Sequence, residues 1–160
     1  MTKSECYACI SQNQETIRAC NSAISTLNTE ISELGQSKGV FEELGSTLTQ
    51  CKNTSVLKLG ENTEVNGINS KIVRNFTSKM ESDIHGESFT SVYNGFGMGI
   101  SSIDTTIANK NGEINNLNAQ IEQCNNTISA MYAEIRRIEE QERAEAEAAA
   151  RSSKKAVTAK

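Results

Sequence analysis

The residue types that most often carry out enzyme chemistry are scarce in this sequence. Its single histidine, His85, precedes Gly86, and such a pair is more typical of a turn than of a general base. One histidine also excludes a histidine pair or cluster as metal ligands. We therefore expect no catalytic residue, no metal site and no bound cofactor.

The five cysteines include one motif with known chemistry, the Cys-x-x-Cys of Cys6 and Cys9. A redox or zinc role would need a strand-to-helix context or a second cysteine pair, and the sequence contains neither. We favour ordinary helix-face thiols, with the redox or metal role as the alternative. Cys20 and Cys124 occupy seam positions, where cysteine acts as a small hydrophobic residue.

The run Gly95-Phe96-Gly97-Met98-Gly99 is rich in glycine, but no predicted strand precedes it, as a phosphate-binding loop requires. Its alternating glycines either weaken a helix or let another backbone approach closely. Without a phosphate loop, a dinucleotide fingerprint or a nucleophile elbow, the sequence predicts a protein that is not an enzyme. The chemistry that remains is apolar recognition.

Composition points to protein partners. The formal net charge of -4 disfavours general nucleic-acid binding. No apolar run approaches the roughly 18 to 20 residues that a membrane span needs, and the N-terminus lacks the apolar stretch of a signal peptide. We expect a cytoplasmic protein with no nucleic-acid partner and no membrane span. The alternative is secretion with a partner by a route that reads no signal peptide.

A heptad repeat dominates the C-terminal half. Isoleucines recur at every seventh residue from Ile100 to Ile135, and a second row follows three residues later, interrupted only by Lys110. The N-terminal half repeats the pattern from Ile10 to Leu34, with Asn13 as a polar intrusion that we expect to set register, and resumes irregularly after Gly35. Such a repeat keeps one narrow stripe facing a partner helix.

These stripes predict an all-α fold, an elongated antiparallel helical hairpin or coiled coil with a short central helix. The hairpin domain covers 1–138, with long helices at about 4–52 and 88–150, a loop over Asn53–Gly67 and a central helix at about 64–84. Residues 139–160 form a solvated helical extension and a disordered basic tail. Direct pairing would bring Ile10 near Ile135 and Ile24 near Ile121 to Cys124. Pairing between chains stays an alternative.

Two sets of residues follow from this interpretation. The first packs the seam between the long helices: Ile10, Ile17, Ile24, Leu27, Ile31, Leu34, Ile100, Ile103, Ile107, Ile114, Leu117, Ile121, Ile128 and Ile135. Large apolar residues around the bend are too numerous for a loop-rich segment to hide, and exposed apolar patches mark partner sites. The second set is therefore the candidate partner-binding surface: Phe76, Met80, Ile84, Gly86, Phe89 and Phe96.

The stretch Ile84-His85-Gly86-Glu87-Ser88-Phe89, followed by the isoleucine repeat up to Ile138, resembles the WXG-type helical hairpins of bacterial type VII secretion. It is most similar to the small helical proteins encoded beside LXG toxins in Gram-positive bacteria. Ile84 stands where that family often has Trp. Arg136, four residues after Tyr132, stands where its export signal has an acidic residue, and this suits an accessory partner better than an autonomously exported protein.

This resemblance implies a targeting factor that binds the helical N-terminal domain of a secreted toxin and assists its export. A second small helical protein would be a further candidate partner. The alternative reading of the same heptads is a homo-oligomeric structural coiled coil, such as a phage or surface component.

Overall fold

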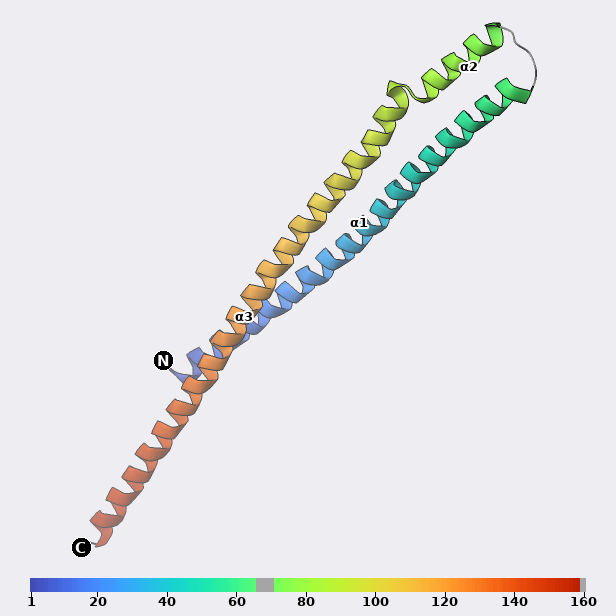
Figure 1. Ribbon diagram of the computed structural model, residues 1–160. Coiled ribbons are helices and arrows are strands. Elements are labelled where there is room, and N and C mark those ends of the chain that lie inside the picture. The colour runs from blue at the N-terminus through green and yellow to red at the C-terminus, as the bar shows by residue number, and fades with distance from the viewer. Residues whose placement is uncertain (66–70, 159–160) are drawn as a thin grey trace. The chain divides into compact units, whose positions relative to one another are not determined.

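The computed structural model describes residues 1–65 and 71–158, and throughout this part of the chain the elements are helices. Helix α1 spans Lys3–Val65, α2 spans Lys71–Ile84 and α3 spans Glu87–Thr158 (Figure 1). The all-α prediction is confirmed, because the described residues contain no strand. The chain divides into two compact units. Unit 1 comprises Met1–Leu27 with Gly112–Lys160, and unit 2 comprises Asn28–Asn111.

In unit 1, α1 and α3 run antiparallel. Lys3 Nζ lies 2.5 Å from Glu142 Oε2, and Cys20 Sγ lies 3.5 Å from Gln120 Oε1, so numbers rise along one helix as they fall along the other. Cys6, Ile10 and Ile135 form a buried cluster against which Ile128 and Met131 pack. The predicted proximity of Ile10 and Ile135 is confirmed, and the level of Ile24 stays a prediction.

A capping box begins α1. The Glu5 amide donates to Thr2 Oγ1 at 3.3 Å, while the Thr2 amide donates to Glu5 Oε2 at 2.7 Å. The two residues thereby satisfy backbone donors that a helix start leaves unpaired. The hydrogen bond from the Thr2 backbone lowers the pKa of the Glu5 carboxyl.

In unit 2 the same two helices also run antiparallel. Lys110 Nζ lies 2.6 Å from Glu30 Oε2, and further along α1 the Phe41 ring meets the Phe96 ring. The hairpin prediction is confirmed in each unit, since an early part of the chain pairs with a late part in both.

Helix α1 continues where a loop was predicted. Asn53 to Val65 is helical, and Asn66 and Gly67 lie outside the described residues. Lys52, Val56 and Leu59 follow at steps of four and three residues and are half-buried, so the inward stripe persists. Asn and Thr cost a helix only about half a kcal/mol each relative to Ala, and no proline stops it.

The other two helices also differ from their predicted bounds. Helix α2 begins at Lys71 rather than near residue 64, with 66–70 outside the described residues. Helix α3 begins one residue early, because the Gly86 carbonyl accepts the Thr90 amide at 3.3 Å. It continues to Thr158 through the predicted disordered tail, since its Ala, Glu, Lys and Arg residues are strong helix formers. Residues 159 and 160 lie outside the description.

Candidate partner-binding surface

The groups with potential chemistry are dispersed. Within residues 1–65 and 71–158, no three His, Cys, Asp or Glu side chains gather in a metal-binding cluster. His85 is exposed, and Cys6 and Cys9 of the Cys-x-x-Cys are fully buried and half-buried free thiols. The observations that bear on function therefore concern the packing of the helices.

Every predicted seam residue, from Ile10 to Leu34 and from Ile100 to Ile135, is buried or half-buried. The two polar interruptions find different partners. The Asn13 amide donates to the Cys9 carbonyl of its own helix at 2.8 Å, whereas Lys110 crosses to Glu30. Sequence reasoning missed Glu30, although its place beside the Ile31 row put it on the flank that faces α3.

An aromatic contact joins α1 to α3 in unit 2. The rings of Phe41 and Phe96 meet edge to face, with centroids 6.0 Å apart. Each ring lies over a glycine of the opposite helix. A Cβ on Gly99 would lie 3.3 Å from Phe41 Cε1, and one on Gly45 would lie 3.9 Å from Phe96 Cδ2. The neighbour at Gly99 is a side chain, so the close approach of another backbone that was expected for the glycine run stays a prediction.

Beside this contact lies a cavity of about 670 Å³ between α1 and α3, which we call the aromatic groove. Its α1 wall runs from Phe41 to Leu57. Its apolar lining is Phe41, Leu57, Tyr93, Phe96 and Ile100, and its polar lining is Glu42, Ser46, Thr49, Gln50, Asn53 and Thr54. The groove therefore presents an apolar floor with a mostly uncharged polar rim.

The six predicted partner-binding residues do not form one exposed patch. Phe76 and Met80 are exposed on α2, by 64% and 37%, while Ile84 and Gly86 are half-buried. Phe89 and Phe96 are also half-buried, and of the six, Phe96 lines the groove. Leu57 and Tyr93, which sequence reasoning missed, are exposed groove residues. Tyr93 lies seven residues before Ile100, the first isoleucine of the α3 heptad row, and could have been found by extending that row toward the N-terminus.

A second set of contacts holds Phe89 in place. Its ring stacks on Tyr93, with centroids 6.1 Å apart and an interplanar angle of 11°. Lys52 Nζ lies 4.2 Å from the centre of the Phe89 ring, within the range of a cation–π interaction. These contacts restrain Phe89, and they leave Tyr93 half exposed at the groove.

The turn between α2 and α3 is tight at Gly86. The His85 amide donates to the Glu81 carbonyl at 2.9 Å and the Gly86 amide to the Asp83 carbonyl at 3.2 Å. A Cβ on Gly86 would lie 3.1 Å from the Ser82 carbonyl oxygen. Because that neighbour is backbone, a side chain could be admitted only by shifting the end of α2.

Apolar burial is distributed unevenly between the units. Among the described residues, the buried hydrophobic side chains all belong to unit 1: Cys6, Ile10, Cys20, Cys124 and Ile135. Most of the exposed large hydrophobic side chains belong to unit 2, namely Val40, Leu44, Leu57, Phe76, Met80, Val92, Tyr93 and Met98, whereas unit 1 exposes Met1, Tyr7 and Tyr132. Where exposed apolar residues are contiguous, they are typical of a surface for interaction.

Comparison with known proteins supplies no relative that would identify this surface. The chain matches no protein-family model, no curated protein and no solved structure. Over the described residues, no helix has a stretch long and apolar enough to cross a membrane.

Proposed function

We propose that this protein is a non-enzymatic helical partner that binds the helical N-terminal domain of a type VII secreted toxin and assists its export. The observation that carries the proposal is the set of large hydrophobic side chains that unit 2 exposes, while the buried hydrophobic residues of the described chain lie in unit 1. A helical surface that is apolar and unpaired suits a partner that is itself helical.

The turn at Gly86 adds support for the resemblance. Glycine in the W-x-G-type motif sits between two helices, and here Gly86 separates α2 from α3, where a Cβ would lie 3.1 Å from the Ser82 carbonyl oxygen. In the proposed role the protein meets the toxin in the cytoplasm, where both are made. Whether it then leaves with the toxin is part of the same proposal.

The heptad seams bear on the alternative of a homo-oligomeric coiled coil. Within each unit, α1 and α3 of one chain cover each other's apolar stripes, as the buried cluster of Cys6, Ile10 and Ile135 illustrates. A seam that is filled within one chain leaves little reason for a second copy to pair along it. We therefore favour a different protein as the partner.

Co-expression with the helical N-terminal domain of an LXG toxin, which the proposal expects to be encoded beside this gene, tests the proposal. Size-exclusion chromatography with light scattering should give a complex whose mass is the sum of the two chains in a fixed ratio. This chain alone should be monomeric or poorly behaved. A symmetric self-assembly that the toxin domain leaves unchanged would instead support the structural coiled coil and contradict the proposed role.

A further inference from the structure

The aromatic groove has the length to receive a helix. Its α1 wall, from Phe41 to Leu57, covers about 24 Å at 1.5 Å per residue, which matches a helix of roughly four turns. The lining residues all lie in α1 and α3, whose backbone groups are paired within their own helices, so no open strand edge is offered to an extended peptide. A helix that brings its own backbone hydrogen bonds fits such a groove.

The floor of the groove has places for large apolar side chains. Leu57 is 67% exposed and Tyr93 is 50% exposed, so both offer apolar surface that the described residues leave uncovered. A Cβ on Gly97 would meet nothing within 4 Å, so the α3 backbone is accessible there. A leucine or phenylalanine of an incoming helix can approach α3 closely at Gly97 because no side chain intervenes.

The near absence of charge around the groove indicates that the helix it binds has an apolar face. The α3 wall of the groove runs from Tyr93 to Ile100, within a longer stretch from Ser88 to Ile103 that contains no Asp, Glu, Lys or Arg. Among the residues that line the groove, Glu42 alone carries a charge. Interface cores are depleted in charge and enriched in aromatic residues, and this wall lacks charge and carries Tyr93 and Phe96.

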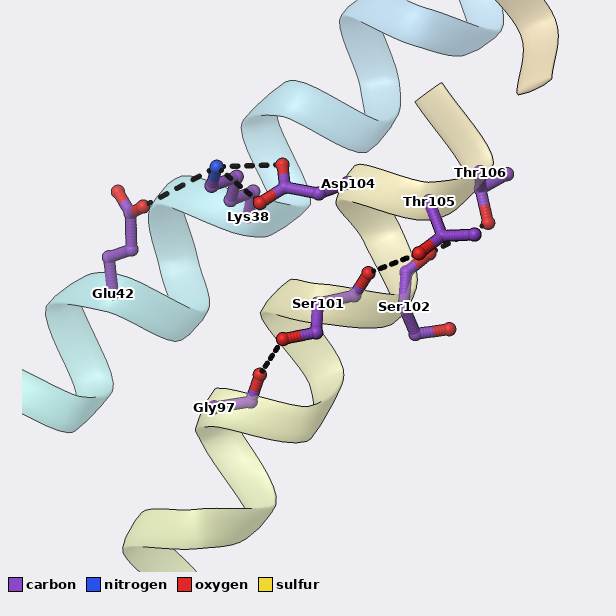
Figure 2. Close-up of polar contacts among 8 residues, drawn as sticks. All are labelled: Lys38, Glu42, Gly97, Ser101, Ser102, Asp104, Thr105 and Thr106. Carbon is purple, nitrogen blue, oxygen red and sulfur yellow. Dashed lines mark hydrogen bonds and ion pairs between the residues drawn. The ribbon is translucent and has the colours of Figure 1, made fainter. Parts of the chain in front are cut away.

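Glu42 is available to a partner cation. Lys38 Nζ lies 2.7 Å from Asp104 Oδ1 but 4.0 Å from Glu42 Oε1, so Lys38 is held mainly across the helices by Asp104 (Figure 2). The Glu42 side chain is 58% exposed. Its carboxylate therefore keeps capacity for a second positive charge at the Phe41 end of the groove.

We infer that the aromatic groove binds one amphipathic helix of the partner, with large apolar side chains spaced three and four residues apart against Phe41, Tyr93 and Phe96. A lysine or arginine of that helix reaches Glu42 and fixes its direction. The inference rests on the proposed function, since it names the surface at which the toxin domain is met.

Filling the groove tests the site. Gly97→Leu places a side chain in the groove, and Gly95→Leu is the matched control, because Gly95 lies outside the groove and also has nothing within 4 Å of its Cβ position. Circular dichroism should show both variants folded. By calorimetric titration with the toxin domain, Gly97→Leu should lose roughly tenfold or more in affinity, as loss of a central apolar contact does, while Gly95→Leu is unchanged. Equal affinities for both variants would overturn the site.

Reversing the charge of Glu42 tests the direction in which the partner helix lies in the groove. The probes are two labelled helical peptides of four turns with the same leucine stripe, one ending in Lys and the other in Glu. By fluorescence anisotropy the wild-type chain should prefer the Lys peptide by roughly fivefold, the scale of an exposed ion pair, and Glu42→Lys should reverse that preference. Glu43→Lys, next to Glu42 but outside the groove, should keep it. Failure of both peptides to bind the wild-type chain contradicts the inference.

The outcomes separate this inference from the proposed function. If the toxin domain binds wild type and Gly97→Leu equally, the groove is not the site and the proposed function stands. If the toxin domain binds neither, the proposed function fails, and the peptides alone decide the groove. If wild type dimerises and Gly97→Leu is monomeric, a second copy occupies the groove and the inference of a different partner is overturned.

Discussion

Gly97 and Gly99 lie two residues apart on α3 and have opposite surroundings. Phe41 of α1 lies over Gly99, while the space beside Gly97 is open. A helix places residues two positions apart on different faces, so one glycine meets the facing helix and the other does not. Whether a glycine position of α3 can accept a side chain therefore depends on which residue of the facing helix lies opposite it.

Alanine substitutions should therefore separate the two glycines. We expect Gly97→Ala to raise the free energy of unfolding by about 1 kcal/mol, the usual gain for replacing an exposed helical glycine. Gly99→Ala should gain clearly less or lose stability, because its Cβ would lie 3.3 Å from Phe41 Cε1. Urea unfolding followed by circular dichroism measures both. Equal stabilisation by Gly97→Ala and Gly99→Ala would show that the Phe41 side chain moves aside without a loss of free energy.

Gly86 should be the glycine least able to accept a side chain. We expect Gly86→Ala to lower the free energy of unfolding by about 1 kcal/mol or more, since its Cβ would crowd the Ser82 and Asp83 carbonyls. Gly60→Ala, where nothing lies within 4 Å, is the control and should be stabilising. A Gly86→Ala variant as stable as Gly60→Ala would contradict the tight turn.

At the scale of elements, the heptad of α1 extends further than its isoleucines. Seven-residue steps from Ile31 reach Lys38, Gly45, Lys52 and Leu59, and each of these is buried or half-buried. By contrast, the apolar residues Val40 and Leu44 lie off this row and are exposed. Lys38, Gly45 and Lys52 hold inward positions of α1 in unit 2, so fewer apolar side chains are buried there.

The seam of α3 should not tolerate charge. The double substitution Ile114→Asp and Ile121→Asp puts two carboxylates at half-buried positions. We expect a loss of several kcal/mol, roughly 2 kcal/mol or more at each site, with lower helicity and melting temperature. Asn115→Asp with Asn118→Asp adds the same charge at exposed positions and should stay near wild type. Unchanged melting of the isoleucine variant would contradict the packing scheme.

At the scale of the whole molecule, ion pairs on both helices set how stability varies with pH. Hydrogen bonds to Glu142 and Asp104 raise the pKa values of Lys3 and Lys38 above 10.5. A backbone bond from Thr2 and a bond from Arg137 lower the pKa values of Glu5 and Glu134 below 4.5. These groups are exposed, so each contribution is small.

The directions of these pKa shifts predict a range of pH over which the stability of the fold is constant. A lysine whose pKa is raised by folding stabilises the fold below about pH 10.5, and this stabilisation is lost as the pH rises through the pKa of the folded state. A carboxyl group whose pKa is lowered by folding stabilises the fold above about pH 4.5, and this stabilisation is lost as the pH falls through the pKa of the folded state. The melting temperature should therefore be flat from about pH 5 to pH 10 and fall on both sides. The variant Lys38→Met, which lacks the ion pair with Asp104, should show a smaller decrease in melting temperature at high pH than the wild type. A melting temperature that rises above pH 10 would contradict these pairings.

The sequence determined the type of element and the buried stripe. A 3.5-residue repeat is a local property of the chain, so the seam residues from Ile10 to Leu34 and from Ile100 to Ile135 could be named without knowing what lies opposite. The absence of proline permitted long helices, although the Asn- and Thr-rich stretch after Asn53 concealed how far α1 continues.

Only the tertiary structure decided the pairings across the helices. Glu30 meets Lys110, Phe41 covers Gly99, and each pair joins residues far apart in the sequence. Such contacts depend on the register between α1 and α3, which a periodic stripe leaves open because a shift by one heptad preserves its pattern. For the same reason, periodicity could not tell that Phe96 would line a groove while Phe76 would face solvent.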